Sequence, residues 1–285
     1  MSLIVVALIG VILALISGIF MMRSKMRKIW AELWSIQSQM NATRRYIVEH
    51  SKRLTLLEVG DKFRLKAAMP SQNGEDVFLY NFFGDKRNGF YIEIGAYDGF
   101  SFSNTYFFEA LGWGGILIEP VPNLYRQCLV RRPNSRVINA AVGNPGEQRL
   151  TRFSAVEGPQ GVDTLSFMNV NPQHLARVQN EGGVIHNIEV PLYSLNELLI
   201  DYRGEIDFVS IDVEGAELDV LHGFDLERFQ PRVLVIEDNS NGADRDVTRY
   251  LSSHGYVERF RCEHNVFYTR KDEHRGFLWQ FNMEA

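Results

Sequence analysis

The chain has 285 residues and a formal net charge of −5, and its composition is 45% hydrophobic and 23% charged. This length suits one large domain or two small ones, and the share of apolar side chains excludes an intrinsically disordered chain. The two cysteines, Cys128 and Cys262, lie far apart and outside metal-ligand spacing, which excludes a disulfide framework and a cysteine zinc site.

Charge is distributed unevenly along the chain. Residues 23–66 carry 11 Lys and Arg against 4 Asp and Glu, so the rest of the chain is strongly acidic. A basic segment beside an acidic domain is typical of a segment near anionic lipid headgroups. Because the larger part of the chain lacks a net positive field, the distribution argues against a nucleic-acid partner.

The first 22 residues are predicted to form a membrane anchor. Leu3 to Met22 carry no charge, and at ~1.5 Å per residue this segment spans the ~30 Å hydrocarbon core of a bilayer. A cleaved signal peptide is the alternative, but it would need a basic start, a shorter apolar core and small residues at its cleavage site. Basic residues from Arg23 to Lys28 follow, so we expect a single-pass protein whose catalytic domain is cytoplasmic.

Residues 23–68 are predicted to form a helical stalk. Positions between Met26 and Leu57 alternate in steps of three and four, most of them are apolar, and no Pro or Gly interrupts them. This is the period of a coiled coil, so we expect a homo-oligomer through the stalk. The alternative is an amphipathic helix that packs on its own domain or lies on the membrane. The seam positions are Met26, Ile29, Leu33, Ile36, Met40, Thr43, Ile47, His50, Leu54 and Leu57.

Residues 69–285 are predicted to form one α/β domain, because short apolar runs alternate with amphipathic segments. We expect a Rossmann-like, mostly parallel sheet with helices on both faces. Residues 154–186 fit neither strand nor helix, and we expect a loop or lid there. Strands are expected over 89–94, 115–119, 136–140, 206–212 and 232–237, then an antiparallel pair over 255–260 and 266–269, and helices over 104–111, 123–131, 195–201 and 216–221.

A glycine-rich turn follows the first expected strand, in FYIEIGAYDGFSFSNT (residues 90–105). Glycines at such a turn let a ligand approach the backbone closely. The dinucleotide fingerprint G-x-G-x-x-G is not met, because Tyr97 and Phe100 occupy its second and third glycine positions. This disfavours a nucleotide-dependent oxidoreductase. The second strand ends at Glu119, 24 residues after Gly95, where an acid accepts hydrogen bonds from ribose hydroxyls.

Carboxylates gather after the strand of residues 206–212. Asp212 ends this strand, Glu214 and Glu217 follow it, and Glu237, Asp238 and Asn239 end the next strand. Carboxylates at the ligand-binding edge of a sheet are costly unless they are solvated, paired or functional. For Glu217, complementing a helix N-terminus is as good an explanation as a functional role.

Taken together, these segments resemble the FkbM family of S-adenosylmethionine-dependent methyltransferases, whose members mainly methylate hydroxyl groups of sugars and natural products. The resemblance runs from about Ser71 to Arg270. The chain departs from the family in Ser194-Leu195-Asn196, where Thr-Leu-Asp is frequent, and in the anchor and stalk, which lie outside the family domain. The resemblance rests on SQNGEDVFL, FYIEIGAYDG, GWGGILIEPVPN, NAAVGN, SLNEL and IDFVSIDVEGAELDVLHGF.

The resemblance implies a class I methyltransferase fold, S-adenosylmethionine as the cofactor and a set of site residues. It implies that Glu119 binds the ribose, that Ala141 lies near adenine, and that Asp212 and Glu214 border the methyl acceptor. The residues implied to line the methionine moiety are Glu93, Gly95, Asp98 and Gly99.

We therefore predict O-methylation of a hydroxyl on a glycan, a lipid-linked acceptor or a small compound. Asp212 is the first candidate for contacting the acceptor and is counted with the cofactor site as well, while Glu214 and Glu237 are the further catalytic candidates. His222 and His264 are weaker candidates. We predict no dedicated metal site, although oxygens of Asp212, Glu237 and Asp238 could hold Mg²⁺. A catalytically silent membrane scaffold with the same fold is the alternative function.

Overall fold

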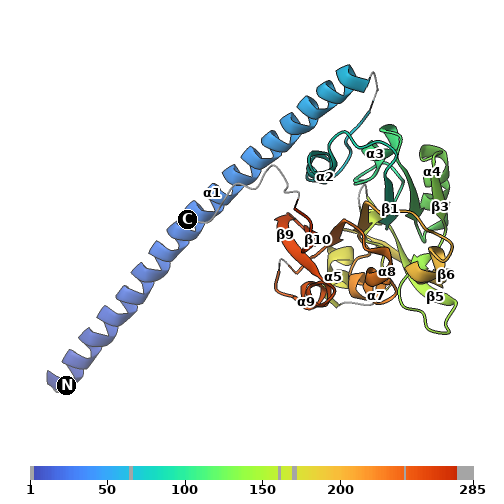
Figure 1. The fold of residues 1–285 in the computed structure, drawn as a ribbon. Helices are drawn as coiled ribbons and strands as arrows, with labels where there is room; N and C mark the ends of the chain where they lie inside the picture. The colour runs from blue at the N-terminus through green and yellow to red at the C-terminus, as the bar shows by residue number, and fades with distance from the viewer. Residues whose placement is uncertain (1–2, 64–66, 160–161, 169–171, 241, 275–285) are drawn as a thin grey trace. The chain divides into compact units, whose positions relative to one another are not determined.

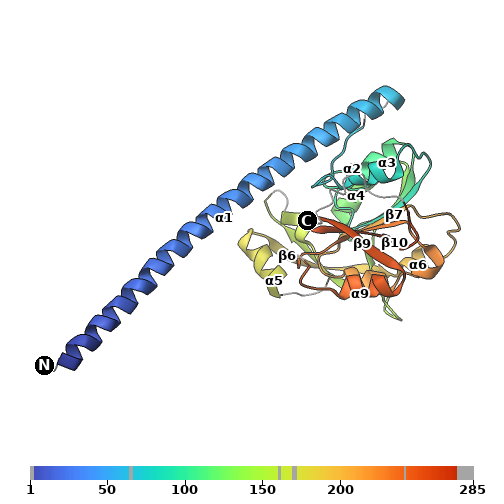
Figure 2. The same ribbon diagram turned by 60° about the vertical axis from the view of Figure 1, so that its left-hand side comes forward.

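The computed structural model describes residues 3–63, 67–159, 162–168, 172–240 and 242–274. Figure 1 draws the chain as a ribbon, and Figure 2 shows the same ribbon turned by 60°. The chain divides into two compact units, Met1–Ser51 and Lys52–Ala285. One helix, α1 (Leu3–Phe63), makes up the described part of the first unit, and its last turns belong to the second.

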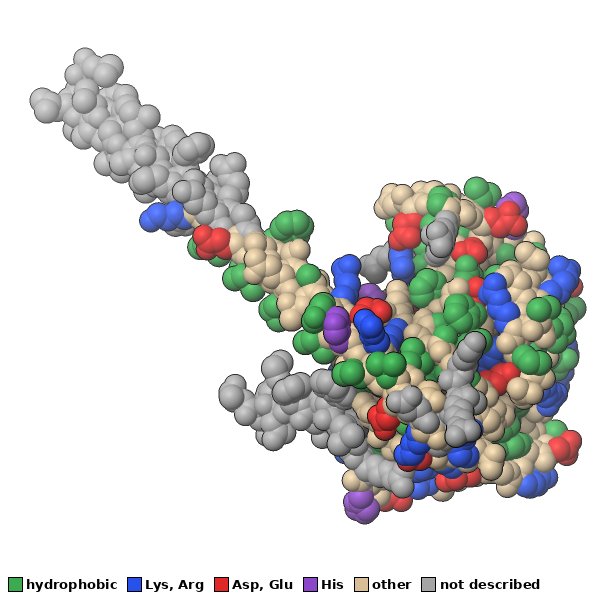
Figure 3. All heavy atoms as spheres, turned by 90° about the horizontal axis from the view of Figure 1, so that it is seen from above, with side chains coloured by type: hydrophobic (Ala, Val, Ile, Leu, Met, Phe, Trp, Pro, Cys, Tyr) green, Lys and Arg blue, Asp and Glu red, His purple; other side chains and the backbone are tan. Residues whose placement is uncertain are grey.

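The described part of α1 exposes the predicted seam. All eight of its apolar positions are exposed, from 47% at Ile47 to 67% at Leu54, and Figure 3 shows hydrophobic side chains along this part of the helix. Among the described residues, no helix is both long and apolar enough to cross a membrane. The predicted anchor falls on side chains outside the described part, so the anchor and the coiled coil both stay predictions.

The second unit is built on a seven-stranded sheet in the order β3-β2-β1-β7-β8-β10-β9. The first five strands in this order are parallel, and β10 runs antiparallel between β8 and β9. Chain order reverses between β1 and β7, where open α/β sheets bind their ligands. The predicted Rossmann-like sheet is thus confirmed. The strands are β1 (Phe90–Ile94), β2 (Gly114–Ile118), β3 (Ser135–Ile138), β7 (Phe208–Ile211), β8 (Val233–Glu237), β9 (Tyr256–Cys262) and β10 (Asn265–Arg270).

Helices cover both faces of this sheet, because side chains alternate between the faces along each strand. Ile92 faces one core together with α6 (Leu195–Leu198), α7 (Glu217–His222), α8 (Leu226–Phe229) and α9 (Asp246–Ser253). Its neighbour Tyr91 faces the other core, with α2 (Glu75–Phe83), α3 (Tyr106–Ala110) and α4 (Pro122–Arg131). Four of these helices begin within two residues of the expected starts, whereas α2, α8 and α9 are not predicted from the sequence.

Residues 141–193 form a second, three-stranded sheet in the order β4-β6-β5. The expectation of a loop over residues 154–186 is therefore wrong for most of the described part of that segment. A small apolar core, which includes Val156, Leu165 and Val178, holds the segment together. Its elements are β4 (Ala141–Val142), β5 (Leu150–Glu157), the 3₁₀ helix η1 (Val162–Leu165), α5 (Pro172–Asn180) and β6 (Val184–Tyr193).

Candidate active site

A cavity of about 390 Å³ lies at the carboxyl ends of β1, β2, β7 and β8. Its other wall comes from the residues between β5 and β6. Pockets of this size hold cofactors and small substrates. Five of the predicted cofactor residues line the cavity, and Asp98 and Gly99 are not among the lining residues. The five are Glu93, Gly95, Glu119, Ala141 and Asp212.

The turn after β1 brings the backbone close to the end of β7. Gly95 has φ +81°, and a Cβ at this position would overlap the backbone oxygen of Asp212. Tyr97, at the second glycine position of the dinucleotide fingerprint, also has a positive φ, of 51°. This backbone is held because the Tyr97 N–H donates to Glu119 at 2.9 Å and the hydroxyl donates to Asp163 at 2.8 Å. Two hydrogen bonds thus support a tyrosine where that fingerprint has glycine.

Asp98 and Gly99 belong to the same turn but do not line the cavity. Asp98 accepts hydrogen bonds from the backbone N–H groups of Phe100 and Ser101 and pairs with Arg131. Burial acts to raise the pKa of Asp98, but these bonds together lower it. Gly99 faces α4, where an added Cβ would lie 3.1 Å from Cys128. The structure therefore gives both residues a role in holding the turn.

Glu93 lines the cavity, but its oxygens are engaged within the protein. They accept from the Ser103 hydroxyl at 3.0 Å, the Asn104 N–H at 3.0 Å and the Thr105 hydroxyl at 2.7 Å. Arg132, fully buried, contacts the same carboxylate at 3.4 Å. Glu93 therefore anchors the loop of residues 103–105 beneath the cavity, and contact with a methionine moiety stays a prediction for it.

Glu119 directly follows β2, lines the cavity and is 4% exposed. Its carboxylate accepts the N–H groups of Tyr97 and Val121, at 2.9 and 2.8 Å. Burial raises the pKa of Glu119 to about 8, although these two bonds act to lower it. Ala141 is buried and also lines the cavity. Two residues before it, the side-chain amide of Asn139 donates hydrogen bonds to the carbonyls of Glu119 and Pro120. Both predicted donor-side residues thus share one part of the cavity.

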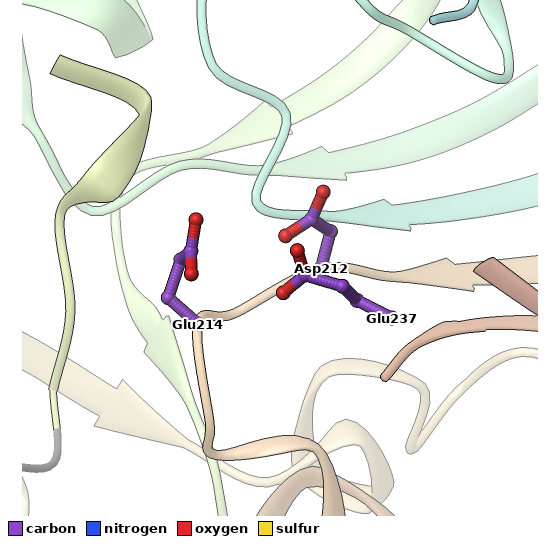
Figure 4. Close-up of side chains that lie close together, drawn as sticks. All are labelled: Asp212, Glu214 and Glu237. Atoms are coloured by element: carbon purple, nitrogen blue, oxygen red, sulfur yellow. The ribbon is translucent and has the colours of Figure 1, made fainter. Parts of the chain in front are cut away.

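Asp212, Glu214 and Glu237 come together as predicted from the strand ends. Carboxylate oxygens of all three lie within 4.8 Å of one another, and Figure 4 shows the three side chains facing one another. Glu214 has a positive φ, of 53°, which turns its side chain back toward the ends of β7 and β8. A divalent cation could use such a set, which has Glu214 where the predicted Mg²⁺ set has Asp238. We call these three residues the carboxylate cluster.

The carboxylate cluster holds protons more tightly than ordinary carboxylates do. Asp212 is open to the cavity but enclosed by its walls, and this enclosure raises its pKa to about 6. Burial and the charge of Asp212 raise the pKa of Glu214 to about 8. Burial and Asp212 also raise the pKa of Glu237 well above its ordinary value. Because Asp212 and Glu237 interact, the two carboxyl groups titrate as a pair, and burial raises the pKa of both.

His174 of α5 is a site residue that the sequence does not predict. Its Nδ1 lies 3.4 Å from Glu214 Oε2, and its Nε2 lies 2.8 Å from the Leu165 carbonyl. Because a carbonyl only accepts, Nε2 carries a proton in this contact. His174 therefore ties η1 and α5 to the carboxylate cluster. No sequence signal identifies it, since the approach of α5 depends on tertiary packing.

The remaining candidates lie as follows. His264 lines the cavity, whereas His222 packs against Tyr250 with ring centroids 5.0 Å apart. Asp238 is turned into its own loop, where it accepts from Ser240 at 2.8 Å and pairs with Arg261. The structure thus places His222 and Asp238 outside the residues that line the cavity.

Glu217 accepts the Gly215 N–H at 2.9 Å at the start of α7, and burial raises its pKa to about 7. It is not among the cavity-lining residues. These positions favour the explanation that it complements the helix N-terminus.

The cavity wall is strongly acidic. Seven carboxyl groups line it against one guanidinium group, that of Arg177. Those of the seven that are ionised are complementary to a ligand with positive charge. The seven belong to Glu93, Glu119, Asp163, Glu181, Asp212, Glu214 and Glu237.

Comparison with known proteins relates this chain to methyltransferases. A family model described as the methyltransferase FkbM domain matches residues 93–258, more than half of the chain. No curated protein matches the chain significantly.

Three solved structures are among those similar to the chain. A methyltransferase FkbM from Methylobacillus flagellatus KT has 16% identity and a TM-score of 0.39, over 65% of this chain and 44% of that one. The chain therefore spans less than half of that protein. A precorrin-6y C5,15-methyltransferase from Geobacter metallireducens GS-15 has 14% identity and a TM-score of 0.37, with 73% and 93% covered. A human methyltransferase 10 domain containing protein has 12% identity and a TM-score of 0.39, over 78% of this chain and 94% of that one.

Proposed function

Because the chain belongs to the FkbM methyltransferase family, we propose that it is an S-adenosylmethionine-dependent O-methyltransferase acting on a glycan or lipid-linked hydroxyl. The observation that carries this proposal is the juxtaposition, in one cavity, of Glu119 and the carboxylate cluster. Glu119 suits a ribose, and the carboxylate cluster suits the activation of a hydroxyl. The family implies the donor, and the acceptor follows from this chemistry together with the predicted anchor.

The donor half of the cavity fits S-adenosylmethionine. When bound, this cofactor supplies an activated methyl group on a positively charged sulfonium. Glu119 has one lone pair on each oxygen beyond the two N–H groups it accepts, so it can receive both ribose hydroxyls. Ala141 leaves room for an adenine ring. The acidic wall stabilises the positive charge of the donor and holds the neutral sulfur of the product less strongly.

The acceptor half supplies a base in the carboxylate cluster. Asp212, whose pKa is raised to about 6, orients the acceptor hydroxyl and accepts its hydrogen bond. Bound S-adenosylmethionine would supply the methyl group, and the acceptor oxygen would replace the sulfur on the methyl carbon, with the electron pair of the broken bond left on sulfur. The hydroxyl proton passes to the carboxylate cluster and from there to solvent.

Position in the cell is part of the proposal. The uncharged segment Leu3–Met22 and the basic residues after it support a single-pass anchor with a cytoplasmic catalytic domain. An anchored enzyme meets acceptors that are themselves held at the membrane, which supports a lipid-linked glycan. Protease added to sealed, right-side-out cells should leave the catalytic domain intact. Its digestion would show that the orientation is reversed.

Methyl transfer tests the function directly. Full-length protein is incubated with methyl-labelled donor and fractionated membrane glycans and lipids, and the Asp212→Asn variant serves as the comparison. We expect label in a hydroxyl-bearing acceptor and a fall in turnover of about 100-fold in the variant, with little change in donor affinity. Calorimetry that detects no donor binding to the wild-type protein would instead support the silent scaffold.

A further inference from the structure

Asp163 reaches the donor cavity from the segment between β5 and β6. It belongs to η1 and is among the residues that line the cavity. Its Oδ2 accepts the Tyr97 hydroxyl at 2.8 Å, and its backbone oxygen accepts the Ser166 hydroxyl at 2.9 Å. Its Oδ1 is buried and has no hydrogen-bond partner among the residues that the structure describes. A buried carboxylate oxygen without a partner is costly, so this atom needs an explanation.

The other carboxylates on the donor side are already satisfied. Glu93 is engaged by residues 103–105 and Arg132, and Glu119 by two N–H groups. Of the buried unpartnered side-chain atoms among the described residues, two belong to residues that line the cavity: Asp163 Oδ1 and Glu237 Oε2. Glu237 belongs to the carboxylate cluster on the acceptor side, where its carboxylate lies within 4.8 Å of those of Asp212 and Glu214. Asp163 Oδ1 remains as the free acceptor.

S-adenosylmethionine carries an ammonium group at the end of its methionine moiety, with three N–H donors and a full positive charge. Such a group needs a carboxylate or several carbonyls when it is taken out of water. We propose that Asp163 Oδ1 binds this ammonium group. The inference rests on the proposed function, because it takes S-adenosylmethionine as the donor. It moves part of the methionine site from the glycine turn to the β5–β6 segment.

Tyr97 explains why one oxygen of Asp163 is left for the ligand. Burial and the bond to Asp163 both raise the pKa of the Tyr97 hydroxyl, so it stays protonated and keeps Oδ2 occupied. The same residue donates its N–H to Glu119. One tyrosine therefore links the carboxylate assigned to the ribose with the carboxylate assigned to the ammonium. Donor binding should accordingly stabilise the contact between η1 and the glycine turn after β1.

Two ligands distinguish this role from a purely structural one. S-adenosylhomocysteine carries the ammonium group, whereas 5′-methylthioadenosine has the same nucleoside without the amino-acid tail. Calorimetry on the full-length protein in detergent should show that Asp163→Asn weakens S-adenosylhomocysteine at least tenfold. Affinity for 5′-methylthioadenosine should stay within about twofold. As a matched control, Glu119→Gln should weaken both ligands, because both carry the ribose.

A second variant guards against a folding artefact. Tyr97→Phe leaves the Asp163 carboxylate in place but unsupported, and it should weaken S-adenosylhomocysteine about threefold while sparing 5′-methylthioadenosine. Equal losses for both ligands in Asp163→Asn, or no loss, would overturn the assignment. Wild-type protein that binds neither ligand would instead overturn the proposed function, and the inference with it.

Discussion

The pKa of Glu119 is raised by burial, and the proposed ribose ligand would favour its charged form. Its pKa of about 8 in the ligand-free protein means that it is mostly protonated at pH 7. Ribose hydroxyls donate to a carboxylate, so donor binding should lower this pKa and release a proton. Affinity should therefore rise with pH up to about 8 and level off above it.

Calorimetry in two buffers with different ionisation enthalpies measures the released proton. Glu119→Gln should lose this pH dependence and bind the donor more weakly by about 2 kcal/mol, as expected for charge-assisted hydrogen bonds. Donor affinity that does not change between pH 6 and pH 8 would remove Glu119 from the ribose site.

Glu214 links the site to folding stability. Its folded pKa, about 8, is raised above the ordinary value of 4.5 by burial and by Asp212. A raised pKa adds stability that is complete below the unfolded value and is lost as pH rises through the folded value. Ligand-free protein should therefore lose stability between pH 5 and pH 8, by up to about 1.4 kcal/mol per pH unit for each such group.

Urea denaturation at a series of pH values tests this prediction. Glu214→Gln cannot ionise, so its stability should fall less steeply over the same range. The exposed Glu157, at the end of β5, offers a control, since Glu157→Gln should leave the slope unchanged. Parallel slopes for wild type and Glu214→Gln would show that Glu214 is not held protonated.

The sequence predicts the carboxylate cluster but not the opposite wall. Asp212 and Glu237 end neighbouring parallel strands, and strand ends of one sheet meet at one edge whatever the loops do. Asp163 lines the same cavity, and His174 contacts Glu214, only because β5 and β6 pair and carry η1 and α5 to this side of the sheet. That approach depends on contacts distant in sequence, and no local pattern records it.

Among helices and strands, too, some are predictable from the local sequence and others are not. The strands of the large sheet are predicted to within a few residues, because most of them, such as β2, β7 and β8, are largely apolar runs between polar turns. Helix α2 is missed because EDVFLYNFF is buried on most sides and rich in aromatic residues, so it has no amphipathic period. Strand β6 contains Pro191 and a mixture of polar and apolar residues, which hides it from a search for regular alternation.

The turn after β1 and the residue after β7 are in close backbone contact, at Gly95 and Asp212. A Cβ on Gly95 would overlap the Asp212 backbone oxygen, so Gly95→Ala must move one of two core strand ends. We expect a loss of about 3 kcal/mol or more in stability, measured by urea unfolding. Gly146 also has a positive φ but has open space around it, so Gly146→Ala should cost only about 1 kcal/mol. Equal losses would mean that backbone strain alone decides both.

At the scale of the whole molecule, the question is which face of α1 the second unit covers. The last turns of α1 bury Lys52, Thr55 and Val59 in the second unit, while Leu54 and Leu57 of the seam are 67% and 58% exposed. The face that the domain covers is thus different from the seam face. Within the second unit the seam is therefore open, and both a coiled coil with other copies and a helix packed on its own domain stay predictions.

Paired substitutions on α1 distinguish these possibilities without removing the turns that the domain buries. Ile36→Glu with Met40→Glu places charges on the seam, and Ser35→Glu with Gln39→Glu places the same charges off it. Light scattering in detergent should find wild type and the off-seam pair as oligomers and the seam pair as a monomer, because like charges facing one another oppose knobs-into-holes packing. Donor affinity should be unaffected in all three. A monomeric wild type would leave the exposed seam to the membrane surface, and an oligomeric seam pair would place the interface on another part of the chain.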